Sequence, residues 1–323
     1  MSNETATVTR GDIGGSHDIL SGFVADCQLR GMTGDTLRSY RSNVGLFLDF
    51  LRSRKVDLVH VQIDELRLFL ADLREKNLSG STIANYFAAI STFYEFLIIE
   101  KLAENNPVIS FRKRYLRGLD REKRRRSESR RKLLTVEEMS SLIKSVINIR
   151  DKAILVLLAK TGLRRSELLT LDVDDIIWEN QSIRLKPKAK RSSLIAFFDD
   201  ETARILQMWI SVRETQTQKN EYALFIGDRG RRMGRNTLYK IVTEAAELVG
   251  LHDPDSPHIE DHFSPHCFRH WFTTWLLRNG MPREYVKELR GDARSTDAID
   301  VYYHIDRDDL RNSYLACIPE LYL

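Results

Sequence analysis

The sequence predicts a mainly helical protein of two domains, with a small antiparallel β-meander in the second domain. Apolar residues recur at helical spacing along most of the chain. Three short apolar runs lie between residues 176 and 198, and polar turns separate them. A basic segment without apolar periodicity lies near the middle of the chain, and 323 residues suffice for two domains that each bury a core.

The first domain is expected to be a bundle of about four helices over residues 17–107. Residues 1–16 are polar and are expected to be a flexible N-terminus. The segment from Ser79 to Thr82 supplies a turn and an N-cap before one helix. The apolar series are Leu37, Tyr40, Val44, Phe47, Leu51; Leu66, Phe69, Leu70, Leu73; and Ile83, Phe87, Ile90, Tyr94, Leu97.

Residues 108–132 are expected to form an extended or partly disordered interdomain linker. Between Arg112 and Lys132 the chain carries twelve Lys or Arg residues and three acids, a local charge of +9 in a chain whose net charge is +4. Such a run is usually a solvated linker. A linker this basic can also lie along a phosphate backbone and release its counterions, and we favour this second interpretation.

The second domain is expected over residues 133–323. Thr135 and Glu138 have the spacing of a capping box, and a buried helix begins near Ala153. Residues 176–178, 182–186 and 194–198 are predicted strands, and residues 187–193 are a polar hairpin tip. Further helices are expected over residues 201–212, 236–249 and 265–279, the last with Ser264 as N-cap and Pro265 at the first helical position.

Composition excludes several classes of protein. The apolar fraction of 42% and the charged fraction of 30% are ordinary for a soluble chain, and we expect neither a membrane span nor a secretion signal. The default location is therefore the cytoplasm. Cys27, Cys267 and Cys317 are scattered, which argues against disulfides and against a Cys-rich zinc site. No glycine-rich phosphate loop or paired-carboxylate motif is present, so neither a cofactor nor a metal is expected.

Three local motifs occur in a characteristic order. They are TGLRRSEL at residues 161–168, SPHCFRH at 264–270 and YYH at 302–304, with a basic hairpin between the first two. Together they resemble the catalytic domain of the tyrosine recombinases, the family of phage integrases and Xer-type recombinases. The resemblance covers about residues 135–315, and residues 17–107 resemble the family's SAM-like core-binding domain.

Metal-free cleavage of a phosphodiester needs a nucleophile, cations at the nonbridging oxygens and an acid for the leaving 5′ oxygen. The resemblance implies that Arg164 and Arg269 clamp the phosphate, for which the planar donor fork of a guanidinium is suited. His266 matches the position that assists proton transfer. It lies one helical turn before Arg269, so both side chains project from one face of the helix.

The remaining catalytic groups are also implied by the resemblance. Lys188 matches the general acid at the hairpin tip, with Lys190 and Lys186 as alternatives in the same basic run. Tyr302 matches the nucleophile, and the adjacent Tyr303 is the alternative. Neighbouring side chains on a helix point about 100° apart, so only one of the two can face the phosphate.

One position departs from the family pattern. Where the family usually has a histidine that donates to the phosphate, this chain has Asp292, and an ionised aspartate cannot donate. Asp292 is therefore expected to orient a neighbouring cation, or the donor comes from elsewhere, with Arg290 and Arg294 as candidates.

Three further features of the sequence are expected to be structural. Glu167 is expected to buttress the arginine clamp. Pro265 argues against one continuous helix that would carry the repeated histidines as a metal site. The aromatic run after it is expected to be core rather than a base-stacking surface. The histidines are His258, His262, His266 and His270, and the aromatic residues are Phe268, Trp271, Phe272 and Trp275.

The resemblance implies a site-specific recombinase that acts in DNA integration or dimer resolution through a 3′-phosphotyrosyl intermediate. Its partners would be a duplex recombination site, three further protomers in a tetramer on two sites, and accessory DNA-bending proteins. The segment from Asp306 to Leu323 is expected to tether protomers through Leu310, Tyr314, Leu315 and Ile318. The alternatives are a monomeric topoisomerase of the same chemistry and a DNA-binding protein that has lost cleavage.

Overall fold

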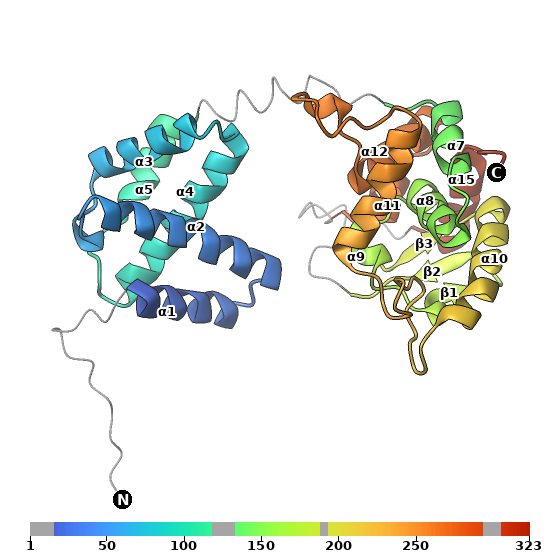
Figure 1. Ribbon diagram of the computed structural model, residues 1–323, viewed down its shortest axis with the longest axis horizontal. Coiled ribbons are helices and arrows are strands. Elements are labelled where there is room, and N and C mark those ends of the chain that lie inside the picture. Colours follow the sequence, from blue (N-terminus) through green and yellow to red (C-terminus); the bar gives the residue numbers. More distant parts are fainter. Residues whose placement is uncertain (1–15, 118–132, 188–192, 293–304) are drawn as a thin grey trace, which may run out of the picture. The chain divides into compact units, whose positions relative to one another are not determined.

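A computed structural model describes residues 16–117, 133–187, 193–292 and 305–323 (Figure 1). The chain divides into two compact units, Met1–Ser129 and Arg130–Leu323. The division falls inside the basic segment predicted as a linker.

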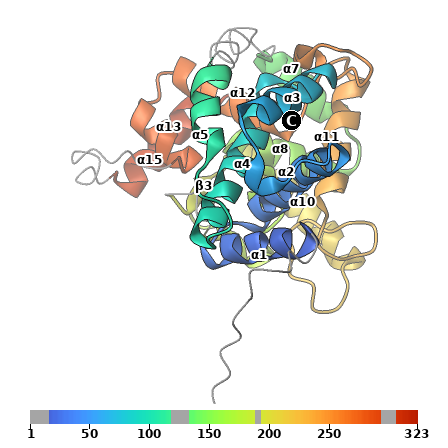
Figure 2. The ribbon, with the colours of Figure 1, turned by 90° about the vertical axis from the view of Figure 1, so that its left-hand side faces the viewer.

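The first unit is a helical bundle, as predicted. Its helix α2 packs against α1 and α4 (Figures 1 and 2). The side chains of Thr33 and Ser79 cap α2 and α4 by accepting hydrogen bonds from backbone N–H groups three residues later. Aromatic residues dominate the core, where Phe23, Phe47 and Phe87 are fully buried. The elements are α1 (Ser16–Leu29), α2 (Gly34–Ser53), η1 (Leu58–His60), α3 (Ile63–Glu75) and α4 (Gly80–Ile99).

Helix α4 is long and apolar enough to cross a membrane by length and composition, which the sequence analysis did not anticipate. Half of that apolar stretch is buried inside the first unit. Phe87, Ile90 and Leu97 on α4 are fully buried in this core. Its apolar character therefore serves packing between helices.

The prediction that the linker begins at residue 108 was wrong. Helix α5 (Pro107–Phe111) and the π-helical turn η2 (Arg112–Leu116) continue the first unit. Asn106 caps α5 at the N–H of Val108, and its amide donates to the Ser91 carbonyl of α4. Phe111 is buried and stacks on Phe87 with ring centroids 5.0 Å apart. The rest of the predicted linker, residues 118–132, lies outside the described residues.

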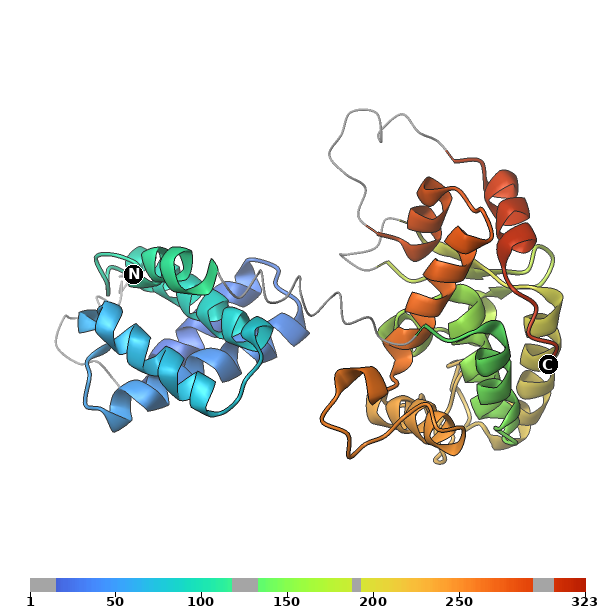
Figure 3. The same cartoon turned by 90° about the horizontal axis from the view of Figure 1, so that it is seen from above.

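The second unit is organised around the buried helix α8. It packs against α7, α10 and α12, and its residues 153–161 are all buried (Figures 1 and 3). The predicted capping box of α7 is confirmed, since Thr135 and Glu138 exchange hydrogen bonds of 3.1 and 2.9 Å. The helices are α7 (Val136–Lys144), α8 (Ile149–Thr161), α9 (Arg165–Leu168), η3 (Val173–Asp175), α10 (Asp200–Gln216), α11 (Arg235–Leu248), η4 (Ile259–Asp261), α12 (Pro265–Arg278), α13 (Arg283–Arg290) and α15 (Arg307–Cys317).

The predicted β-meander is confirmed, with strands shorter than expected. The strands β1 (Ile176–Ile177), β2 (Ser182–Arg184) and β3 (Ile195–Phe197) form an antiparallel sheet in the order β1-β2-β3. Ile183 in the central strand pairs with Ile176 on one side and Ala196 on the other. The tip of the β2–β3 hairpin, residues 188–192, lies outside the described residues.

The C-terminal segment packs on its own unit. Leu310, Tyr314 and Ile318, which were expected to face another protomer, are buried here together with Leu321. After α15 the chain passes between α7 and α10 (Figure 3). The Ser140 hydroxyl of α7 donates to the carbonyl of Leu321 at 2.6 Å. In the single chain the apolar face of the expected tether is therefore already covered.

A buried lysine anchors this tail. Lys160 on α8 has no exposed surface, and its ammonium lies 2.5 Å from Asp199 and 2.7 Å from Glu201. The same ammonium donates to the Pro319 carbonyl at 2.7 Å, while Glu201 accepts from the N–H of Leu321. One cation thus joins α8, the start of α10 and the C-terminus.

Replacing Lys160 by Met should lower the free energy of unfolding by about 3–5 kcal/mol, because two carboxylates would lose their buried partner. Urea unfolding of the full chain measures this change. Lys144→Met on the exposed end of α7 is the matched control and should change stability by less than about 0.5 kcal/mol. Equal stability of the two variants would contradict the anchoring role.

Candidate active site

The site begins where α8 ends at Gly162. Gly162 has φ +59°, and its N–H donates to the Leu158 carbonyl, which closes the helix. A Cβ at this position would lie 2.4 Å from the Phe272 ring of α12. Only glycine fits both the left-handed backbone and the close approach of α12. The carbonyl of Gly162 consequently points at α12 and accepts a 2.9 Å hydrogen bond from Arg269.

Arg269 is the buried cation of the site, with 4% of its surface exposed. Besides Gly162, its guanidinium contacts the Arg290 carbonyl at 2.7 Å and the Asp292 carboxylate at 3.2 Å. Burial and the neighbouring guanidiniums of Arg164 and Arg290 lower the pKa of Arg269 to about 10. Neutral pH is well below that value, so Arg269 remains a cation there.

Arg164 lies across from Arg269 at the N-cap of α9. Its Nη1 donates to Glu167 at 2.9 Å, and its backbone N–H donates to the other oxygen of the same carboxylate at 2.8 Å. Glu167 is 4% exposed, so it buttresses Arg164 as predicted. The Arg164 side chain keeps 34% of its surface exposed, which leaves it accessible to a ligand from solvent.

Asp292 lies at the centre of the cluster, just after α13 ends at Gly291 with φ +58°. One oxygen of its carboxylate lies 3.2 Å from Arg269 and 3.5 Å from Arg164. Its other oxygen lies 3.1 Å from Nε of Arg290. The expectation that Asp292 orients a neighbouring cation agrees with this geometry. The other candidate donor, Arg294, lies outside the described residues.

His266 is exposed on the first turn of α12, one turn before Arg269. At the start of α12, the backbone N–H of the N-cap residue Ser264 donates a hydrogen bond to the Cys267 sulfur at 3.4 Å. Pro265 begins α12, so His258 and His262 precede the helix and the repeated histidines do not share one face.

The aromatic run of α12 is core, as predicted. Phe268, Trp271 and Phe272 are at most 1% exposed. The indole N–H groups of Trp271 and Trp275 donate to backbone carbonyls at the start of the second unit, at 3.4 and 3.1 Å. These rings therefore hold α12 in place and do not form a surface for bases.

Of the three hairpin lysines considered for the general acid, the structure describes Lys186. Its ammonium is hydrogen-bonded to Asp172 and lies 3.9 Å from Asp175. Partial burial would raise the pKa of the Asp172 carboxyl, but hydrogen bonds from Lys186 and Arg232 lower it below its ordinary value. Lys186 is thus held in an ion pair at the base of the hairpin. Lys188, Lys190, Tyr302 and Tyr303 lie outside the described residues.

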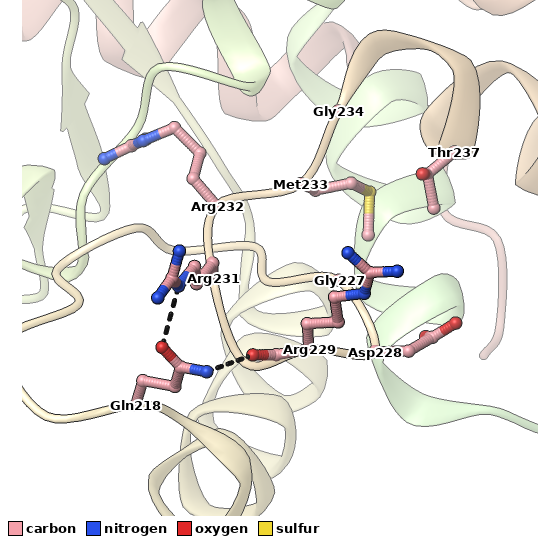
Figure 4. A pocket seen from close by; sticks show the side chains of 9 residues that line it. All are labelled: Gln218, Gly227, Asp228, Arg229, Arg231, Arg232, Met233, Gly234 and Thr237. Carbon is pink, nitrogen blue, oxygen red and sulfur yellow. Dashed lines mark hydrogen bonds between the residues drawn. The ribbon is translucent and has the colours of Figure 1, made fainter.

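A second basic feature is an open pocket of about 800 Å³ before α11 (Figure 4). Gln218 organises it by accepting from Arg231 and donating to the Arg229 carbonyl, both at 2.8 Å. Arg229 and Arg231 are exposed, and Thr237 on the first turn of α11 completes the rim. The arginines of this surface gather through a loop without regular spacing, so no pattern in the sequence marks them.

The backbone acceptors of the arginine cluster are likewise not visible in the sequence motifs. The carbonyls of Gly162 and Arg290 fix the Arg269 guanidinium. Every residue has a backbone carbonyl, so residue type does not show which carbonyls accept these hydrogen bonds. The available signal was the glycine at the end of each helix, Gly162 and Gly291, which predicts a left-handed cap.

The second unit combines two arginines held by buried acceptors with a small β-meander, and a separate helical bundle precedes it in the chain. This organisation resembles that of the tyrosine recombinases. The chain belongs to the phage integrase family. The family model "Phage integrase family" matches residues 132–308, and "Phage integrase, N-terminal SAM-like domain" matches residues 22–101.

Curated relatives agree with this assignment. The chain is 32% identical to tyrosine recombinase XerC of Herpetosiphon aurantiacus over 86% of this chain and 87% of that protein. It is 29% identical to XerD of Chlorobaculum tepidum over 90% and 92% of the two chains. The match to XerC of Corynebacterium glutamicum, at 32% identity, covers 53% of this chain and 52% of that relative, so there the chain spans about half of its length.

Solved structures share the fold. The Tn1549 transposon integrase in complex with circular intermediate DNA matches 91% of this chain and 98% of its own, with a TM-score of 0.62 and 20% identity. A λ integrase dimer bound to a COC′ core site matches 90% and 99%, with a TM-score of 0.64 and 16% identity.

Gly162→Ala should destabilise the second unit by about 3 kcal/mol, because backbone strain of about 1 kcal/mol adds to the clash with Phe272. Gly250→Ala is the matched control, since Gly250 has φ +68° and open space around its Cβ position. It should cost about 1 kcal/mol. Urea unfolding measures the free energy of unfolding of both variants. An equal loss in the two would show that the close approach of α12 to Gly162 does not contribute to the cost of Gly162→Ala.

Proposed function

We propose that this protein is a site-specific recombinase that cuts and rejoins duplex DNA through a covalent 3′-phosphotyrosyl intermediate. The observation that carries the proposal is the pair Arg164 and Arg269. Glu167 and two backbone carbonyls hold the pair, and one side of the cluster is open to solvent. Two guanidiniums fixed in this way can bind the nonbridging oxygens of one phosphate without changing their own positions. The names of the relatives, recombinases and integrases, favour recombination over relaxation of supercoils.

In the proposed reaction the Tyr302 hydroxyl oxygen attacks the scissile phosphorus and the bond to the 5′ oxygen breaks. Lys188 donates a proton to the leaving oxygen, and Arg164 and Arg269 stabilise the negative charge that grows on the phosphate. The phosphotyrosine conserves the bond energy, so attack by a 5′-hydroxyl restores the DNA without ATP. His266, one turn before Arg269, is the proposed acceptor of the proton that the Tyr302 hydroxyl loses as it attacks.

Arg290 is our candidate for the donor that replaces the family's usual histidine. Its guanidinium is held by Asp292 at 3.1 Å, and 34% of its side chain is exposed. A guanidinium donates at every accessible pH, which an aspartate does not.

The proposed partner is a duplex recombination site, bound by four protomers on two sites with accessory DNA-bending proteins, in the cytoplasm at the nucleoid. Exposed Arg229 and Arg231 beside α11 add positive surface for a phosphate backbone.

Because Leu310 and Tyr314 are buried in their own unit, use of the C-terminal segment as a tether requires it to leave that unit. Sedimentation of the full-length protein and of a Leu310→Asp variant, each with paired DNA sites, measures assembly on DNA. Unchanged assembly of the variant would contradict the role of the C-terminal segment as a tether.

The nucleophile is tested with nicked suicide DNA substrates that trap the covalent product. Wild type should give protein-linked DNA on a denaturing gel, and Tyr302→Phe should give none. Tyr303→Phe is the neighbouring control and should keep the adduct. Loss of the adduct in Tyr303→Phe alone would move the nucleophile by one residue, and no adduct from any protein despite DNA binding would favour a non-catalytic protein.

The phosphate clamp is tested by Arg164→Ala against Arg165→Ala, a change at the next residue of the same turn. Arg164→Ala should slow adduct formation by a factor of about 100 or more, because a preorganised donor contributes about 3 kcal/mol to the transition state. Arg165→Ala should change the rate by less than about tenfold. Equal rates for the two variants in a single-turnover assay would contradict the assignment.

A further inference from the structure

The contacts of Arg269 differ in how readily they can be exchanged. Two of its acceptors are carbonyls of Gly162 and Arg290, which belong to the ends of α8 and α13 and cannot leave without disrupting helix ends. The third acceptor is the side chain of Asp292, at 3.2 Å and 32% exposed. The carboxylate of Asp292 is therefore the exchangeable ligand of the buried guanidinium.

The same oxygen of Asp292 also lies 3.5 Å from Nη2 of Arg164. It thus bridges the two guanidiniums that the proposed function assigns to one DNA phosphate. A phosphate oxygen and a carboxylate oxygen carry similar charge and accept similar hydrogen bonds. An anion that bridges Arg164 and Arg269 from the solvent side must compete with Asp292 for these donors.

We infer that the Asp292 carboxylate occupies the position of a phosphate oxygen in the DNA-free protein, and that DNA displaces it. This inference rests on the proposed function, because it assumes that Arg164 and Arg269 bind the scissile phosphate. On displacement the second oxygen of Asp292 keeps its contact with Arg290, so the carboxylate turns aside without losing every partner. Asp292 thereby lowers the affinity of this site for phosphate, because a phosphate must first displace the carboxylate.

Charge explains why such a group is useful here. The described cluster holds three guanidiniums, Arg164, Arg269 and Arg290, against two carboxylates, Glu167 and Asp292. Without the Asp292 charge, Arg269 would be buried beside the guanidiniums of Arg164 and Arg290, and a small anion would be attracted more strongly. The Asp292 carboxylate partly neutralises these arginines and can be displaced by a phosphate that the rest of a bound DNA duplex holds in place.

The probe is inorganic phosphate, which needs no knowledge of the DNA target. Thermal unfolding of full-length wild type, Asp292→Asn and Asp292→Glu is followed as phosphate is added at constant pH and ionic strength. Asp292→Asn should bind phosphate roughly two- to fivefold more tightly than wild type, the range expected for loss of one partly exposed competing ion pair. Asp292→Glu, which keeps the charge, should resemble wild type.

Glu284→Gln is the matched control, because Glu284 is exposed on the first turn of α13 and its change removes the same charge. An equal gain in phosphate affinity for Asp292→Asn and Glu284→Gln would overturn the inference. Adding Arg164→Gln to Asp292→Asn should abolish the gain, and a persistent gain would place the phosphate elsewhere and also overturn it.

If Asp292→Asn does not fold, the competition is read in wild type from the side-chain carboxyl carbon resonance of Asp292. This resonance should shift as phosphate is added, and a resonance that does not move would contradict displacement. The proposed function fails separately, through the absence of a covalent DNA adduct on suicide substrates. A phosphate effect without any adduct would support displacement and reject catalysis, while an adduct without the phosphate effect would do the reverse.

Discussion

The buried guanidinium of Arg269 is the contact on which the second unit's site depends. It joins three segments that are distant in sequence: the end of α8 at Gly162, helix α12 that carries it, and the end of α13 at Arg290. A buried charge is stabilised only if its donors are satisfied, so these segments must meet in one arrangement. Gly162 permits that arrangement, because any side chain there would collide with Phe272.

The acidic partners of the cluster have two different roles. Glu167 is buried and bonded to both the side chain and the backbone of Arg164, which fixes the position of this arginine. Asp292 is about one-third exposed and contacts the guanidiniums from the open side. One carboxylate therefore fixes the position of Arg164, while the other lies on the open side of the cluster, where we infer that a phosphate competes with it.

The tail and the site share helix α8. Lys160 near its end holds Asp199, Glu201 and the C-terminal backbone, and Gly162 two residues later supplies the acceptor for Arg269. Tyr314 of α15 also donates to the Lys160 carbonyl at 2.9 Å. Release of the tail would remove contacts from the helix turn that precedes the arginine cluster. The C-terminal tail and the arginine cluster thus both depend on the last turn of α8.

Local periodicity and short motifs were enough to predict the helical bundle, the β-meander and the capping box at Thr135, and the resemblance to the recombinases singled out Arg164 and Arg269. The sequence could not determine that Phe111 extends the first core, that the tail is covered in the single chain, or that Asp292 bridges Arg164 and Arg269. Each of these depends on residues brought together from distant parts of the chain, over more than a hundred positions between Arg164 and Asp292. Tertiary packing decides such contacts, since spacing along the chain carries no information about them.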